Sequence, residues 1–74
     1  MRRIELSNGV RYGTNNSEGG VFRQNNQSGN WHQIEGNSQS PLFKTAKGFF
    51  SYLRTHYPNN PELHGVKLQN QFGW

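Results

Sequence analysis

Apolar and polar residues alternate at the start of the chain, and this period-two pattern predicts a β-hairpin over residues 1–12. The apolar positions are Ile4, Leu6, Val10 and Tyr12. A three-residue loop, Ser7-Asn8-Gly9, pairs Leu6 with Val10 and places all four apolar side chains on one face, whereas a two-residue loop divides them between two faces. We therefore predict the three-residue loop, with Gly9 in the left-handed conformation that follows such a turn.

A second hairpin is predicted from residues 21–24 and 31–35, which carry strand-forming residues on either side of the polar loop 25–30. The preceding segment, residues 13–20, is polar and rich in glycine, and is expected to be a loop. Leu42 and Phe43 are expected to add a short strand that leads into a helix.

That helix is the strongest helical pattern in the chain. Thr45 is a good N-cap residue, because its hydroxyl can accept a hydrogen bond from a free amide of the first turn. Five positions then recur at helical spacing and predict one buried face: Ala46, Phe49, Phe50, Leu53 and Tyr57. Pro58 predicts that the helix ends at or before Tyr57.

The last sixteen residues carry two weaker patterns. Asn60 as a cap and Pro61 at the first position predict a single helical turn that ends by Gly65. Residues 66–74 can form a last strand that closes the sheet, or a tail whose aromatic residues dock on a partner. The predicted fold is α+β: one domain, residues 1–74, in which a small antiparallel sheet of two hairpins plus short strands packs on one amphipathic helix. Residues 59–74 are its most loosely held part.

The amino-acid composition limits how the core can be built and which chemical functions are possible. With few aliphatic residues, the ten aromatic residues are expected to fill most of the core. The chain has no cysteine and no aspartate, which excludes disulfides and thiol nucleophiles, and its four glutamates form no recognisable pair. We therefore expect no enzyme and no cofactor. No apolar run reaches the length of a membrane span or forms a signal peptide, so a cytoplasmic location is expected.

Histidine and glutamate residues near the C-terminal turns are candidate metal ligands. His56, Glu62 and His64 lie near one another in the sequence, and His32 could join them. Zinc accepts histidine and carboxylate ligands, but this spacing is irregular, and unrelated surface histidines are the simpler interpretation. No metal is expected.

The formal net charge of +4 predicts an acidic partner, with nucleic acid the first candidate. The predicted nucleic-acid-binding residues are Arg2, Arg3, Arg11, Arg23, Gln33, Lys44, Lys47 and Arg54. Arg2 and Arg3 are expected to form a basic N-terminal arm. A curved sheet face bearing Arg11, Arg23 and His32 would enter a groove, with Lys44 and Lys47 on phosphates and Gln24 and Gln33 on base edges.

Residues 20–57 also resemble known DNA-binding domains, namely those of the AP2 type and the arm-binding domains of phage integrases. The resemblance is carried by Gly29-Asn30-Trp31, Phe43-Lys44-Thr45 and Tyr52-Leu53. It implies a three-stranded sheet that enters the major groove while a helix braces it from behind. It also implies that Arg23, Trp31 and Gln33 face the groove.

The alternative hypothesis is a protein-binding inhibitor or adaptor, such as a small phage-encoded regulator that docks on an acidic surface of a host enzyme. Trp31, Phe72 and Trp74 would be its anchors, because interfaces concentrate binding energy in tryptophan, tyrosine and arginine. A basic protein can bind acidic patches on nucleic-acid enzymes, RNA polymerase among them. Charge alone therefore leaves both hypotheses open.

Overall fold

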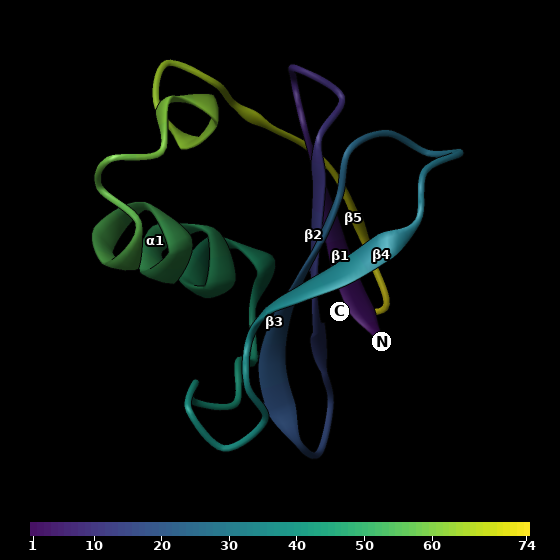
Figure 1. Cartoon of the computed structure of the whole chain (residues 1–74), viewed down its shortest axis with the longest axis vertical. Coiled ribbons are helices and arrows are strands. Elements are labelled where there is room, and N and C mark those ends of the chain that lie inside the picture. The colour runs from purple at the N-terminus through teal and green to yellow at the C-terminus, as the bar shows by residue number, and fades with distance from the viewer.

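The computed structural model describes all of residues 1–74 and has the predicted α+β fold, with one antiparallel sheet and one α-helix (Figure 1). The elements are β1 (Arg2–Leu6), β2 (Arg11–Asn15), β3 (Gly19–Gln24), β4 (Trp31–Glu35), α1 (Ala46–His56), the 3-10 helix η1 (Pro61–Leu63) and β5 (Leu68–Phe72). The five strands lie in the order β4-β3-β2-β1-β5, so the last strand lies beside the first.

The first hairpin has the predicted register. Ile4 pairs with Tyr12, and the Leu6 amide donates to the Val10 carbonyl at 2.9 Å across the three-residue loop. Gly9 has a φ of +89°, in the left-handed region. The prediction is confirmed, and the apolar alternation sets the register because only this loop buries all four side chains.

The expectation of a polar loop over residues 13–20 was wrong. β2 continues to Asn15, β3 begins at Gly19, and these two residues pair with each other across a tight turn. Gly13 lies on the sheet with the Met1 side chain over it, so close that an added Cβ would lie 2.9 Å from the sulfur. Glycines and short polar residues carry no alternation signal, so the sequence pattern hides the strands that they form.

The second hairpin is confirmed, but Leu42 and Phe43 form no strand. The Phe43 carbonyl accepts a 2.6 Å hydrogen bond from Arg2 Nη1, and its ring packs against Phe49 with centroids 5.0 Å apart. The Arg2 side chain thus takes the place of a strand partner for the Phe43 carbonyl. The Phe43 ring packs against the core just before α1 begins.

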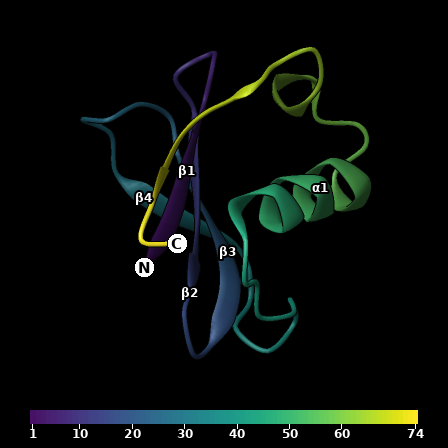
Figure 2. The same ribbon diagram turned by 180° about the vertical axis from the view of Figure 1, so that it is seen from behind.

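The helix prediction is confirmed at both ends. The Thr45 hydroxyl accepts from the Gly48 amide at 3.0 Å, and α1 ends at His56, two residues before Pro58. The single turn η1 is also confirmed, with Asn60 accepting from the Glu62 amide. Both helical elements lie on the same side of the sheet (Figures 1 and 2).

The core is less aromatic than expected. Nine buried hydrophobic residues form it: Ile4, Leu6, Val10, Tyr12, Val21, Ala46, Phe49, Leu53 and Leu63. Only Tyr12 and Phe49 among them are aromatic, so the prediction that aromatic residues fill most of the core was wrong. The other aromatic residues are half-buried at the margin of the core or on the far side of the sheet.

The C-terminal segment is a strand in the structure. Glu5 of β1 pairs with Asn70 of β5. Beyond the strand, the Trp74 indole Nε1 donates to the Arg3 carbonyl at 2.8 Å, and its ring packs against Phe49 with centroids 5.7 Å apart. The α-helix and the 3-10 helix are each too short to cross a membrane.

Candidate nucleic-acid interface

The register of the strands separates the side chains onto two faces. Directly paired residues on neighbouring antiparallel strands share a face. One face carries Ile4, Tyr12 and Arg23 in a row and is covered by α1 and η1. The other face, which we call the open face, has no helix over it (Figure 2). Its side chains are Arg3, Glu5, Arg11, Phe22, Gln24, Trp31, Gln33, Asn70 and Phe72.

Two arginines cover the same aromatic ring on the open face. The guanidinium carbon of Arg3 lies 5.4 Å from the centroid of the Phe72 ring, and that of Arg11 lies 5.5 Å from it. Each contact is worth about 0.5–1 kcal/mol at an exposed site. Phe72 therefore holds two positive groups beside an apolar surface.

Glu5 is the acidic residue of the open face, and it neutralises the charge of one of the two arginines. Glu5 forms an ion pair with Arg11 Nη2 at 3.2 Å and accepts from Asn70 Nδ2 at 2.6 Å. The Asn70 hydrogen bond, followed by the contacts with Arg11, lowers the pKa of Glu5 below its ordinary value. Arg3 has no acidic partner and carries the free positive charge of this face.

The part of the open face formed by β3 and β4 carries aromatic and amide side chains. Phe22 pairs with Gln33, and Gln24 pairs with Trp31 at the end of β4. Gln33 Nε2 donates to the Glu35 carbonyl at 3.1 Å and to Asn37 Oδ1 at 2.8 Å, which orients the amide and leaves its oxygen able to accept.

Gln24 is buried instead, and its amide donates to the Gly29 carbonyl at 2.7 Å. The idea that Gln24 contacts base edges was therefore wrong, because the polar loop 25–30 uses this amide.

Arg2 does not form a flexible basic arm. It belongs to β1, where it points to the helix side, bonds the Phe43 carbonyl and lies with its guanidinium carbon 5.6 Å from the centroid of the Trp74 ring. The prediction of an N-terminal arm was wrong because β5 and β2 both pair with β1 and make it an inner strand.

Arg23 and His32 also lie on the helix side, so the prediction that they face a nucleic-acid groove was wrong. Arg23 binds both carboxylate oxygens of Glu62, and Tyr12 donates its hydroxyl to the same carboxylate. The Arg23 hydrogen bond lowers the pKa of Glu62, while burial, followed by the contact with Glu62, raises the pKa of Tyr12. This network holds η1 against the sheet, and it occupies the Arg23 guanidinium in contacts within the protein.

The remaining predicted cations are exposed on the helix side. Lys44 precedes α1, and Lys47 and Arg54 project from it. The sequence-predicted residues are thus divided: Arg3, Arg11 and Gln33 share the open face, whereas the other five lie on the helix side of the sheet, namely Arg2, Arg23, Lys44, Lys47 and Arg54. One surface cannot combine the two sets.

The predicted protein anchors are divided too. Trp31 and Phe72 lie on the open face, whereas Trp74 is half-buried against the core, where it contacts Phe49 and Arg2. Phe22, Glu5 and Asn70 were missed as members of the face. The alternation within β1 could have identified Glu5 beside Arg3, but Asn70 and Phe72 join them only through the long-range pairing of β5.

Histidines do not gather around Glu62. His56 stacks on Tyr52 with ring centroids 3.8 Å apart, and no three His, Asp or Glu side chains come together in a geometry that could hold a metal ion.

Comparisons with protein families, with curated proteins and with solved structures found no match to this chain. The resemblance to the AP2-type and integrase arm-binding domains therefore stays a prediction.

Proposed function

We propose that this chain is a small non-catalytic nucleic-acid-binding module and that the open face is its interface. The observation that carries the proposal is the grouping of three half-buried aromatic residues, Phe22, Trp31 and Phe72, with Arg3 and Arg11 on a sheet face that no helix covers. Aromatic rings on an open sheet offer stacking surfaces for bases, and arginine adds phosphate contact and stacking of its own.

This arrangement favours single-stranded nucleic acid over a duplex. Base stacking on an aromatic ring requires unstacked bases, and it is worth about 1–3 kcal/mol per base. Only one cation of the open face, Arg3, is free of an acidic partner, which is little charge for holding a duplex by its phosphates. Gln33 supports some base preference, since its free oxygen can accept a hydrogen bond from a base edge.

A transcription-related role in the cytoplasm is part of the same proposal. The basic composition and the absence of cysteine support it. Should the partner be duplex DNA, the same open face would enter the groove, with Trp31 and Gln33 contributing and Arg23 excluded by its contact with Glu62.

The second candidate is a protein-binding inhibitor or adaptor that uses the open face. The Glu5–Arg11 ion pair favours it, because a face with little net charge and two half-buried aromatic anchors, Trp31 and Phe72, also suits a protein surface. This hypothesis predicts affinity that depends little on salt.

Fluorescence anisotropy of a labelled single-stranded oligonucleotide, measured over a series of salt concentrations, tests the proposal. We expect a log-log slope of about −0.7 per phosphate neutralised. Trp31→Ala should lower the affinity by about 1–3 kcal/mol. Arg3→Gln should lower the affinity and flatten the slope.

Lys44→Gln is the matched control, since it removes one positive charge on the other side of the sheet and should change little. Affinity that is indifferent to salt, or equal losses in Arg3→Gln and Lys44→Gln, would contradict an open-face nucleic-acid site.

A further inference from the structure

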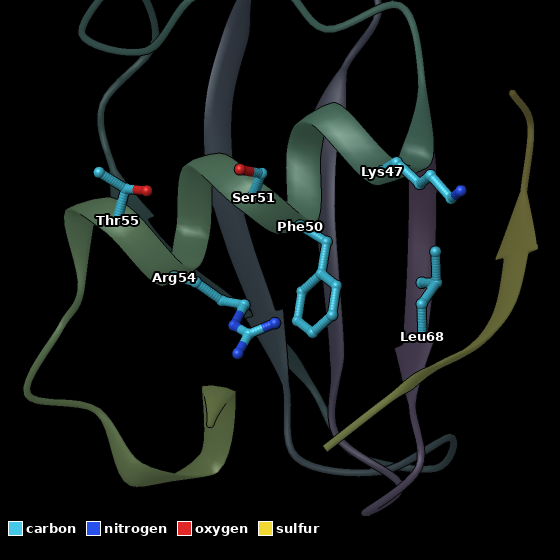
Figure 3. A pocket seen from close by; sticks show the side chains of 6 residues that line it. All are labelled: Lys47, Phe50, Ser51, Arg54, Thr55 and Leu68. Carbon is cyan, nitrogen blue, oxygen red and sulfur yellow. The ribbon is translucent and has the colours of Figure 1, made fainter. Parts of the chain in front are cut away.

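A groove of about 460 Å³ lies between α1 and β5, on the helix side of the sheet (Figure 3). Six residues line it: Lys47, Phe50, Ser51, Arg54, Thr55 and Leu68. The Phe50 and Leu68 side chains project into the space between the helix and the strand, and Lys47 and Arg54 stand toward its two ends (Figure 3). The groove thus has an apolar floor between two cations.

No acid neutralises these cations. Lys47 and Arg54 take part in neither of the two ion pairs, and none of the lining residues is acidic. The Arg54 guanidinium carbon lies 5.3 Å from the centroid of the Phe50 ring, which keeps the charge at the apolar surface. Lys47 and Arg54 are seven positions apart on α1, which is about 10 Å along the helix axis. The chemistry of the groove therefore suits a ligand with an apolar group between two negative charges.

The strand beside the groove is an open edge. β5 pairs with β1 on one side only, so alternate backbone N–H and C=O groups of residues 68–72 point outward without a strand partner. Natural edge strands are often protected by lysine or proline, and the sequence of β5, LQNQF, contains neither. An extended segment can add to this edge by backbone hydrogen bonds.

We propose that the groove and the β5 edge together bind an acidic peptide segment in an extended conformation. The segment adds to the sheet beside β5 and places one apolar side chain on Phe50 and Leu68. Acidic side chains two positions before and after it share its face of the strand and lie about 13 Å apart. The long side chains of Lys47 and Arg54 can reach both carboxylates from their own separation.

Charge complementarity selects this occupant over a second copy of the chain. Pairing two β5 edges would bring the Lys47 and Arg54 side chains of both copies toward one another without any acid to separate them. A nucleic acid would supply negative charge, but it has neither an apolar side chain for the floor nor a backbone that can extend the sheet. The groove and the open face are on opposite sides of the sheet, so this proposal does not depend on the proposed function.

The test uses a labelled peptide with the pattern acid–x–leucine–x–acid, measured by anisotropy against the whole chain. We expect saturable binding that Lys47→Glu and Arg54→Glu each weaken by about fivefold or more. Lys44→Glu makes the same charge change three residues from Lys47, outside the groove, and should stay within about twofold of the parent. A peptide with glutamine in place of both acids should bind weakly. Unfolding curves of each variant show whether the fold persists.

Strand addition is tested separately by methylating the peptide backbone at single nitrogens. We expect methylation at alternate positions to abolish binding and methylation at the positions between them to be tolerated, because only alternate amides face β5. Arg3→Gln and Trp31→Ala, which alter the open face, should leave peptide affinity unchanged, so failure of one proposal is distinguishable from failure of the other.

Several results would overturn the proposal: no saturable binding of the acidic peptide at low salt, equal weakening by Lys44→Glu, or self-association of the free chain that covers Leu68. Loss of oligonucleotide binding in Lys47→Glu, with no peptide binding by the parent, would instead make the groove a phosphate contact.

Discussion

Arg23 donates two hydrogen bonds to the Glu62 carboxylate, with Nε 2.7 Å from Oε2 and Nη2 2.9 Å from Oε1. The pair joins β3 to η1 and shares its carboxylate with the Tyr12 hydroxyl. Both side chains are mostly buried, with 29% and 22% of their surface exposed. Arg23, which the sequence predicts to bind nucleic acid, therefore has a structural role.

Glu62→Gln should destabilise the fold by about 2 kcal/mol at neutral pH, because it removes charge-assisted hydrogen bonds from a largely buried site. The measurement is the free energy of unfolding in denaturant. Glu18→Gln is the control, since Glu18 is exposed and its side chain accepts only a long 3.3 Å hydrogen bond from Asn37. Equal stability of the two variants would contradict the structural role of the pair.

The same pair predicts an acid dependence. The pKa of Glu62 is lowered in the folded state from an ordinary value of 4.5, mainly by the Arg23 hydrogen bond. The folded state therefore gains stability above that ordinary pKa and loses it as the pH falls through the lowered pKa. Unfolding measured between neutral pH and strong acid should show a steeper loss for the parent than for Glu62→Gln. Parallel curves would show that Glu62 does not titrate differently in the two states.

The contacts of two tyrosines on the helix side predict that the folded state loses stability at alkaline pH. The hydroxyls of Tyr52 and Tyr57 each donate to Glu35 at 2.6 Å. Burial, followed by the bond to Glu35, raises the pKa of Tyr52 to about 12 and raises that of Tyr57 as well. Because these folded-state pKa values exceed the ordinary value of 10.0, stability is full below about pH 10 and falls as the pH rises toward 12.

Tyrosinate absorbance in the near ultraviolet measures this directly. The folded protein should show little tyrosinate at pH 10, where unfolded tyrosine is half ionised. Tyr52→Phe should leave a weaker alkaline loss of stability. Half-ionisation of the folded chain near pH 10 would contradict these contacts.

Trp74 should contribute to stability and not to binding. Its ring packs on Phe49, and its indole nitrogen bonds the Arg3 carbonyl. Trp74→Ala should cost about 2 kcal/mol, and Trp74→Phe, which keeps the ring contact but loses the hydrogen bond, should cost about half as much. Thermal unfolding with the same variants in a binding assay separates the roles. Lost binding in a fully stable Trp74→Ala chain would restore Trp74 as a partner anchor.

The parts of the fold that the sequence predicts are the local ones. The hairpin of Leu6 and Val10 follows from one loop and four apolar residues, and α1 follows from Thr45 at its start and Pro58 beyond its end. These features depend on residues within a turn or two of each other, so alternation and capping rules apply directly.

The assignment of faces depended on contacts far apart in the chain. Val21 and Phe22 are adjacent apolar residues, so alternation in β3 leaves the direction of Arg23 open; its partner Glu62 lies 39 residues further on. Phe72 meets Arg3 and Arg11 only because β5 returns to pair with β1. The open face is therefore a product of long-range pairing, and the sequence indicated its residue types but not their grouping.

Amide chemical-shift mapping by NMR, during titration with a short single-stranded oligonucleotide, is the decisive test of the open face as a nucleic-acid interface. We expect the largest shifts on Arg3, Arg11, Phe22, Trp31, Gln33 and Phe72. We expect Arg23 and the residues of α1 to shift little. Shifts concentrated on α1, or no shifts at low salt, would contradict the open face as a nucleic-acid interface.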